Sequence, residues 1–559
     1  MIDCHTHTIT DDDSTPENRA ERADQLRRQG EALGVEKFVM IGRTGNTVEE
    51  CCRYNGEVAA YQREHSDLIY GWARAHPAWE DEAVAEFRRA VQEDGLVGLK
   101  HHFGSTQIQI TDERFYALAE AAVEMDVPVI SHVMNRHPDE VRETEASSWH
   151  VAELAESFPT LKFISGHIAA GGYWEHRIKE IQDYDNVYLD LSGSNCEAGV
   201  VEMAAEYLGT ERLIYGSDGW FIPCVGKLEA ADLTPEEKVE IGYKFEELLA
   251  DNVPTKYSEA ELAEKRAATL ARFEAIEDGY DETIVDANSF IGAWPYRPFA
   301  KTADELAERM ERRGVDRALV SSMEAIFYQD PHQGNHELAA AVEGREDRFI
   351  PVATVDPTMP AWKRDLEECL GDLGMEAVKL LPLYHDYAPN DDAAKACLDY
   401  CAERDVPVII CGPLEDQRGR HTTHDIRGED DIRRDFFSSE QVDQLIELLR
   451  DCPETDVVIA DAWNHADRIK EETTEVRPEG VRYRNRVRTG KTLFTLGDFY
   501  MWWPYQGEEV IDHFGTEHLV TGTQLPFKAF DSHYFAKYLP VDEAEKDRVR
   551  GGNVLALLE

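Results

Sequence analysis

The sequence predicts an α/β protein made of two tandem (β/α)₈ TIM-type barrels. Its 559 residues exceed what one hydrophobic core usually organises, which indicates at least two domains. Short apolar runs such as 38–41 and 163–165 alternate with charge-rich segments of helical period such as 82–93. This alternation is typical of a parallel sheet covered on both faces. Each half has about eight such alternations, which fits a (β/α)₈ barrel of ~250 residues; a doubly wound sheet is the alternative architecture.

An internal repeat is the second observation behind this prediction. Asn55 and Asn335 begin similar runs that reach Pro77 and Pro357 at the same spacing. Further matched pairs, in the same order, are 98–100 with 377–379, 127–130 with 406–409, and 177–180 with 468–471. The offset stays near 280 to 290 residues, which indicates a duplicated unit.

The repeat also sets the expected domain limits. We expect a first barrel over residues 1–277 and a second over 283–559. The acidic helical stretch 258–277 is the expected connector, and residues 278–282 read as a short exposed linker.

The composition narrows the class of protein. Hydrophobic residues make up 42% and aromatic residues 9% of the chain, which is enough for a folded core. No stretch approaches the ~20 apolar residues of a membrane helix, and the amino-terminal residues carry no export pattern. The ten cysteines are scattered, so we expect buried thiols and a cytoplasmic location.

The charge balance is strongly acidic, with 111 acidic against 58 basic residues and a net charge of −53. The negative electrostatic potential of such a chain repels phosphate backbones and anionic lipids, so neither nucleic acid nor a membrane is an expected partner. The acid is spread over helical stretches, which suits a halophilic protein in concentrated salt, where self-repulsion is screened. The alternative is an acidic protein of an ordinary cytoplasm.

Five polar side chains stand where predicted strands end. His5 and His7 share one face of the first strand, because side chains alternate along a strand. His132, His167 and Asp218 each follow an apolar run directly. Barrel enzymes place their catalytic groups at these strand ends, and imidazole with carboxylate suits a zinc-like ion. Taken alone, the His-x-His pair would be equally consistent with surface histidines.

The motifs that contain these residues resemble a known family. They are Ile-Asp-Cys-His-Thr-His at 2–7, Gly-Leu-Lys-His-His at 98–102, Val-Ile-Ser-His at 129–132, Ile-Ser-Gly-His at 164–167 and Tyr-Gly-Ser-Asp at 215–218. Over nearly all of residues 1–250 the chain resembles the amidohydrolase superfamily. The similarity is to its amidohydrolase-related group, which includes aminocarboxymuconate-semialdehyde decarboxylase and γ-resorcylate decarboxylase.

This resemblance implies a site with one divalent metal ion. His5, His7, His132 and Asp218 are then the ligands, and His167 orients the attacking water or the substrate. Zinc is the expected ion, with manganese as the alternative. The resemblance is to the single-metal branch, so no carboxylated lysine is assigned.

Proton transfer and substrate binding are assigned to four residues. Asp218 can take a proton from water and pass it on, and His167 is the second acid/base group. Lys100 and His102, at the end of the fourth strand, are expected to bind a substrate carboxylate. Lys100 as a simple strand-terminal cation is the alternative.

Three further acids are assigned no chemistry. Asp3 resembles the family's aspartate before the His-x-His pair, and we expect it to support the backbone. Glu180 and Asp190 are expected to be solvated or paired, like the other acids of the surface.

The second copy lacks the ligands. The positions that match His5, His7, His132 and Asp218 hold Asn288, Phe290, Cys411 and Gln524. The segment that matches the region of His167 is 459–463. A neutral amide and a phenyl ring cannot replace imidazole ligands, so this copy should not bind the ion. A different site formed by Cys411, Asp461 and His465 is the alternative.

The sequence therefore predicts a metal-dependent hydrolase that acts on an amide, a lactone or a related bond of a small carboxylated substrate. A non-oxidative decarboxylase with the same ligands is one alternative, and a catalytically weak binding or regulatory protein is another. The second barrel could act as a built-in neighbour that lends an arginine from 418–434 or 482–488. The chain would then be an intramolecular pseudo-dimer, and higher oligomers are left open.

Overall fold

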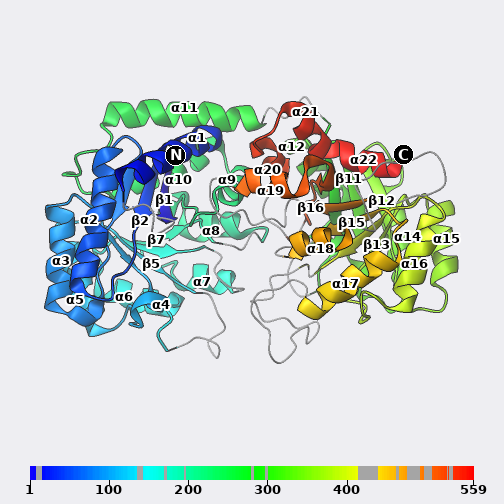
Figure 1. Ribbon diagram of the computed structural model, residues 1–559, viewed down its shortest axis with the longest axis horizontal. Helices are drawn as coiled ribbons and strands as arrows, with labels where there is room; N and C mark the ends of the chain where they lie inside the picture. Colours follow the sequence, from blue (N-terminus) through cyan, green and yellow to red (C-terminus); the bar gives the residue numbers. More distant parts are fainter. Residues whose placement is uncertain are drawn as a thin grey trace. The chain divides into compact units, whose positions relative to one another are not determined.

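The chain folds as two compact units, which Figure 1 shows in the colours of the sequence. The computed structural model describes residues 1–7, 15–134, 143–168, 173–193, 197–277, 283–295, 300–412, 414, 438–460, 462, 465–474, 491–495, 506–525, 527 and 533–559. The first unit comprises Met1–Ile276, and the second comprises the described residues from Glu277 onward. The predicted linker 278–282 and the arginine-rich stretches lie outside the described residues.

The first unit is a barrel of parallel strands. They are β1 (Ile2–His7), β2 (Lys37–Ile41), β3 (Ile69–Trp72), β4 (Leu99–His101), β5 (Val129–His132), β6 (Phe163–Gly166), β7 (Val187–Asp190) and β8 (Leu213–Ile214). They pair in chain order within the runs β1–β3 and β4–β8. Ala73 bridges to Leu99 between the runs, and the amide of Cys4 donates to the carbonyl of Tyr215 at 3.0 Å. These contacts close the ring, which confirms the predicted (β/α)₈ fold.

Helices follow the strands of this unit. They are α1 (Pro16–Leu33), α2 (Val48–Glu64), α3 (Asp81–Gln92), α4 (Phe103–Thr106), α5 (Glu113–Met125), α6 (Ser148–Ser157), α7 (Trp174–Glu180), α8 (Val200–Leu208), α9 (Phe221–Ala230), α10 (Pro235–Leu248) and α11 (Glu259–Glu277). Local sequence explains their limits. In α1, the hydroxyl of Thr15 accepts from the amide of Asn18 at 3.2 Å, and Pro16 occupies the first turn. The chain leaves α1 at Gly34 with a φ of 73°.

The second unit repeats the architecture. Its parallel strands are β9 (Val285–Ala293), β11 (Arg317–Ser322), β12 (Phe349–Thr354), β13 (Ala377–Leu380), β14 (Val408–Cys411), β15 (Val457–Ala460), β16 (Thr492–Thr495) and β17 (Leu519–Val520). They pair in chain order, and the amide of Ala287 donates to the carbonyl of Thr521 at 2.8 Å to close the ring. The short strand β10 (Ala300–Lys301) pairs antiparallel with β9. The second barrel of the prediction is thus confirmed.

The helices of the second unit, within the described residues, also alternate with its strands. They are α12 (Ala303–Arg312), α13 (Glu324–Phe327), α14 (Pro331–Val342), α15 (Trp362–Gly371), α16 (Asp392–Ala402), α17 (Ser439–Asp451), α18 (Ala466–Thr473), α19 (Gln506–Phe514), α20 (His533–Tyr538), α21 (Glu543–Asp547) and α22 (Asn553–Leu558).

The repeated asparagines have the same structural role in both units. The side-chain amide of Asn55 bonds the backbone N–H and C=O of Arg74, at 2.8 and 2.9 Å. That of Asn335 bonds the same two groups of Thr354, both at 2.9 Å. Each asparagine lies on a helix and satisfies buried backbone groups at the end of the third strand of its barrel, which explains why both copies have it.

The composition also predicted buried thiols and no membrane-spanning helix. Every cysteine in the described part of the chain is a free thiol, and all but Cys52 are buried. Among the described residues, no helix is both long and apolar enough to cross a membrane.

Candidate metal centre and active site

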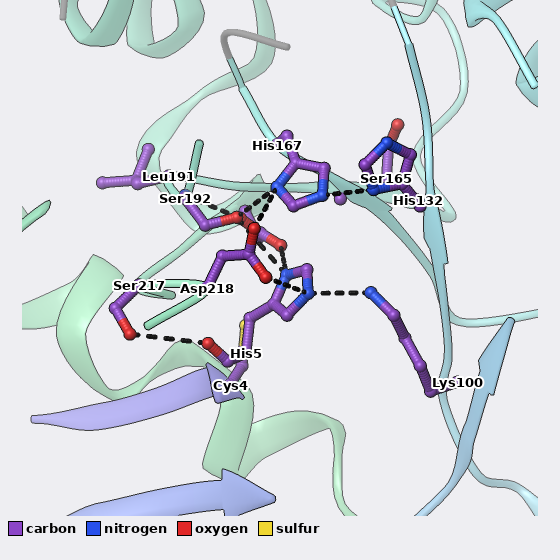
Figure 2. Close-up of polar contacts among 12 residues, drawn as sticks. Cys4, His5, Lys100, His132, Ser165, His167, Leu191, Ser192, Ser217 and Asp218 are labelled. Carbon is purple, nitrogen blue, oxygen red and sulfur yellow. Dashed lines mark hydrogen bonds and ion pairs between the residues drawn. The ribbon is translucent and has the colours of Figure 1, made fainter. Parts of the chain in front are cut away.

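Three donor side chains converge at the carboxyl end of the first barrel. The Oδ1 atom of Asp218 lies 2.9 Å from Nε2 of His7 and 3.3 Å from Nε2 of His5 (Figure 2 shows the His5 contact). One atom from each of the three residues lies within 4.8 Å of the others. This spacing suits ligands around one divalent ion, and we call His5, His7 and Asp218 the ligand cluster.

The backbone around the cluster is held in an uncommon conformation. Asp218 has a φ of 56°, in the left-handed region, and its amide donates to the carbonyl of His5 at 2.6 Å. Asp3 ties the same segments together, because its Oδ1 accepts from the amides of His5 and Ser217 at 3.0 and 2.9 Å. Burial raises the pKa of Asp3 to about 6. These bonds agree with the supporting role predicted for Asp3.

Asp190 is paired, as one of the two expected outcomes, but it is not a surface acid: its partner is His5 of the ligand cluster. Asp190 ends β7, is completely buried, and its Oδ2 lies 2.8 Å from Nδ1 of His5. The hydrogen bond fixes the His5 ring with Nε2 turned to Asp218. A carboxylate behind a ligating imidazole orients the ring and makes it a better donor to a metal. Its place at a strand end, like that of His132, was the signal in the sequence that could have identified it.

His132 and His167 form a pair beside the cluster. The Nε2 atom of His167 lies 2.7 Å from Nδ1 of His132, and its Nδ1 lies 2.9 Å from Oγ of Ser192 (Figure 2). Nδ1 of His167 is also 3.7 Å from Oδ2 of Asp218. His132 is therefore turned to His167 and lies outside the three-residue ligand cluster. His167 has a φ of 70°.

A second donor group overlaps the first. His5, His167 and Asp190 also bring one donor atom each within 4.8 Å of the others. His167 can therefore act either as an acid/base group or as a metal ligand. The metal content of a His167 variant distinguishes these two roles.

Arg177 holds the backbone at His167 and was not expected to take part in the site. It is completely buried, donates to the carbonyl of Gly166 at 2.9 Å, and also bonds the carbonyl of His167 and the hydroxyl of Ser165. Burial lowers the pKa of Arg177 to about 9. Its counterpart in the repeat, Arg468, is instead a half-exposed residue paired with Asp443. The shared motif therefore serves the site only in the first copy.

The protonation of these groups suits a metal site. Burial lowers the pKa of His7, and lowers those of His132 and His167 well below the usual value. Burial alone would raise the pKa of Asp218, but the neighbouring His167, His5 and His7 hold it well below its usual range. Neutral imidazoles and a charged carboxylate are the forms that bind a divalent ion.

The substrate-binding residues proposed from the sequence lie next to the cluster. Nζ of Lys100 is 2.7 Å from Nε2 of His5, and burial lowers its pKa to about 8. The ring of His102 lies 4.5 Å from that of His132, centroid to centroid. Its Nδ1 is buried and has no hydrogen-bond partner among the described residues. Both side chains therefore have polar atoms available at the site.

Arg74 adds a second buried cation that the sequence did not single out. It follows β3, is 5% exposed, and its Nε donates to Oγ1 of Thr44 at 2.8 Å. Within the described residues no carboxylate pairs with it. Burial lowers its pKa to about 10. Burial first, and the charge of Arg74 to a lesser extent, lower the pKa values of Lys100 and His102. A buried guanidinium without an anion is a ready partner for an anionic ligand.

At the mouth of the second barrel, the carboxyl end of its strands, side chains contact one another where the first barrel has its ligand cluster. Nζ of Lys379, the counterpart of Lys100, donates to Oδ1 of Asn288 at 2.6 Å and lies 4.0 Å from the ring centre of Phe290. Phe290 packs edge-to-face on Phe527. Gln524 keeps the left-handed backbone of Asp218, with a φ of 52°, but offers only an amide.

This arrangement confirms that the second copy has lost the metal site of the first. In the part of the chain that the structure describes, no metal-binding group forms at this mouth. Asp461, a member of the alternative site with Cys411 and His465, lies outside the described residues.

The role of Asp190 leads to a prediction. Asp190→Asn should reduce metal affinity and activity by about 10- to 100-fold, because the His5 ring loses the anion that orients it. Metal content after dialysis and kcat/KM with added metal measure the effect. The exposed Asp183→Asn is the matched control and should leave both unchanged. Wild-type affinity in Asp190→Asn would show that the carboxylate does not support the ligand.

Comparison with known proteins gives the family. The amidohydrolase family matches residues 2–265 and 280–559, so the chain belongs to it. The two matched stretches correspond to the two barrels. A search of curated proteins finds no match.

Solved structures of several decarboxylases are similar to parts of the chain. The 2,6-dihydroxybenzoate decarboxylase from Rhizobium has 18% identity and a TM-score of 0.35, with 44% of this chain and 97% of that chain covered. The 5-carboxyvanillate decarboxylase from Sphingomonas paucimobilis has 16% identity, a TM-score of 0.35, and coverage of 44% and 98%. A dihydroxybenzoic acid decarboxylase from Polaromonas, solved with bound manganese, has 17% identity, a TM-score of 0.35, and coverage of 44% and 96%.

Proposed function

We propose that the first barrel catalyses the metal-dependent, non-oxidative decarboxylation of a small carboxylic acid. The observation that carries this proposal is the buried cation Lys100, whose Nζ lies 2.7 Å from Nε2 of His5 in the ligand cluster. The buried Arg74, which follows β3, is the second cation that we propose for the substrate. In decarboxylation the carbon–carbon bond breaks, its electron pair stays on the substrate, and a proton replaces the departing CO₂. Fixed positive charge near that carbon stabilises the negative charge that develops on it.

One group of residues would hold the ion and the substrate carboxylate, and a second group would transfer the proton. His5, His7 and Asp218 would hold the ion, which supplies Lewis acidity towards a substrate oxygen. Nε2 of His5 has one lone pair, so it cannot serve both the ion and the ammonium group of Lys100. Lys100 would then turn to the substrate carboxylate, together with Arg74.

Proton transfer falls to the groups that face each other beside the ion. Oδ2 of Asp218 and Nδ1 of His167 are 3.7 Å apart, and Ser192 and His132 hold the His167 ring at its two nitrogens. This pair can relay a proton from water to the substrate carbon, where the proton replaces CO₂.

Hydrolysis of an amide or lactone is the second candidate. The specific observation in its favour is the position of Asp218, whose Oδ1 faces His5 and His7 while Oδ2 lies 3.7 Å from Nδ1 of His167, so the carboxylate can accept a proton from a water molecule at the site. The same ligand cluster and the same cations would serve a carboxylated substrate in that reaction.

Product analysis in D₂O separates the two reactions. A panel of aromatic and cyclic carboxylic acids, amides and lactones is incubated with the metal-loaded full chain. Decarboxylation releases CO₂ and leaves one deuterium on the carbon that carried the carboxylate, whereas hydrolysis introduces no carbon-bound deuterium. Turnover of lactones or amides alone, without CO₂, would replace the first proposal by the second. No turnover across the panel in the presence of a tightly held ion would favour a binding protein.

Arg74 provides a test of carboxylate binding. Arg74→Met should raise KM by about 10- to 100-fold with a smaller change in kcat, since the substrate carboxylate loses a charged partner. Arg74→Lys should restore part of the affinity, because it returns the charge without the two parallel N–H donors. The exposed Arg53→Met on α2 is the control. An unchanged KM in Arg74→Met would remove Arg74 from the substrate site.

The identity of the ion, the domain limits and the role of the second barrel complete the proposal. Zinc and manganese both suit the ligand cluster, and metal analysis of the purified protein decides between them. We propose 1–277 and 283–559 as the limits of the two domains. We also propose that the second barrel lends an arginine to the active site of the first.

A further inference from the structure

The helical layer of the second barrel holds a cluster of ligand-type side chains that has no role in the site described above. His332 and His336 lie one turn apart on α14, and Glu368 lies on α15. The Nε2 atoms of His332 and His336 lie 3.3 and 3.2 Å from the two oxygens of Glu368. One donor atom from each of the three residues lies within 4.8 Å of the others.

We propose that His332, His336 and Glu368 form a second metal site, which binds a transition-metal ion such as Zn²⁺ between α14 and α15. Histidines at positions i and i+4 lie on one face of a helix, so both rings can reach one ion. Two imidazoles and a carboxylate form a ligand set that zinc accepts, with one position left for water.

The neighbouring residues support the rings in this arrangement. Sγ of Cys369 lies 3.5 Å from Nδ1 of His332, so the nitrogen opposite the donor atom already has a partner. Such support for the second nitrogen is a regular feature of ligating histidines. A pocket beside the cluster is lined by His332 together with Asp330, Asp356 and Asp365, and these carboxylates attract cations to it.

The first barrel provides an internal comparison, because Asn55 and Asn335 place the two helix pairs in register. Between α2 and α3 of the first barrel, Glu86 accepts hydrogen bonds from Arg89, Asn55 and Cys52. Its charge is thus neutralised by an arginine. In the second barrel, two imidazoles face Glu368 instead. The same pair of helices therefore carries an internal ion pair in the first barrel and a set of metal-ligand side chains in the second.

Zinc titration of the full chain tests the site. Protein that carries the metal of the first barrel is titrated with Zn²⁺ by calorimetry, in parallel with His336→Ala and with Gln333→Ala, a control on the same helix. We expect wild type and Gln333→Ala to bind one further equivalent per chain, and His336→Ala to bind it at least tenfold more weakly. His332→Ala should behave as His336→Ala does.

The absorption spectrum of added Co²⁺ gives a second measurement that does not depend on activity. A tetrahedral Co²⁺ spectrum should appear in wild type and be absent in His336→Ala. His336 is 42% exposed, so its replacement should leave the fold intact even if His332→Ala does not. No further equivalent of zinc in wild type, or equal binding in His336→Ala, would overturn the proposal.

Discussion

His7→Ala should abolish turnover, with a fall in kcat/KM of at least about 10³-fold, and should weaken metal retention. The reason is that His7 supplies one of the three closely spaced donors of the ligand cluster, with Nε2 2.9 Å from Asp218. An ion held by fewer donors dissociates more readily, and the charge stabilisation that it supplies is worth several kcal/mol. Replacement of His5 or Asp218 by alanine should have the same direction of effect. His132 lies outside the cluster, and loss of the ion in His132→Ala would restore it as the fourth ligand predicted from the sequence. Metal content after dialysis and steady-state kinetics measure both losses.

The duplicated barrel supplies the matched control. Asn288 occupies in the second barrel the place of His5 in the first, and its Oδ1 accepts from Lys379. Asn288→Ala should lower the stability of the second barrel, because the buried ammonium loses its acceptor, yet leave metal content and turnover unchanged. Full metal and full turnover in His7→Ala would show that the ligand cluster is assigned wrongly.

His167→Ala should lose turnover by about 10²- to 10⁴-fold while the ion stays bound, as is typical for removal of a general acid/base. Its ring touches Ser192 and His132 and lies 3.7 Å from the Asp218 carboxylate, a position that suits proton handling. Metal analysis and single-turnover kinetics of the same preparation are the measurements. A variant that loses the ion would make His167 a ligand, together with His5 and Asp190, and would leave His132 as the neighbouring group.

The fold could be predicted from the sequence because the strands are apolar throughout and the repeat doubles the signal. Five side chains of the site could also be located, since each lies at or shortly after the end of such a strand. The loss of ligands in the second copy was visible for the same reason: Asn288 and Phe290 cannot coordinate as imidazoles do.

The parts of the site that were missed depend on packing. The place of Asp190 at a strand end could have drawn attention to it. In a chain with 30% charged residues, however, only the folded barrel shows that Asp190 and Arg74 are buried. Arg177 was read as a repeat marker, but its buried bonds at His167 have no equivalent at Arg468. Such roles follow from which neighbours a side chain meets, and a single sequence does not give those neighbours.

Anomalous X-ray diffraction from crystals of the metal-loaded full chain, recorded at the zinc and manganese absorption edges, tests the central claim most directly. The account predicts one strong peak among His5, His7 and Asp218, and no peak at the mouth of the second barrel beside Asn288 and Phe290. The absorption edge at which the peak in the first barrel appears identifies the ion. A peak at the second mouth, or none within the first barrel, would contradict the claim that the first copy alone keeps the catalytic metal.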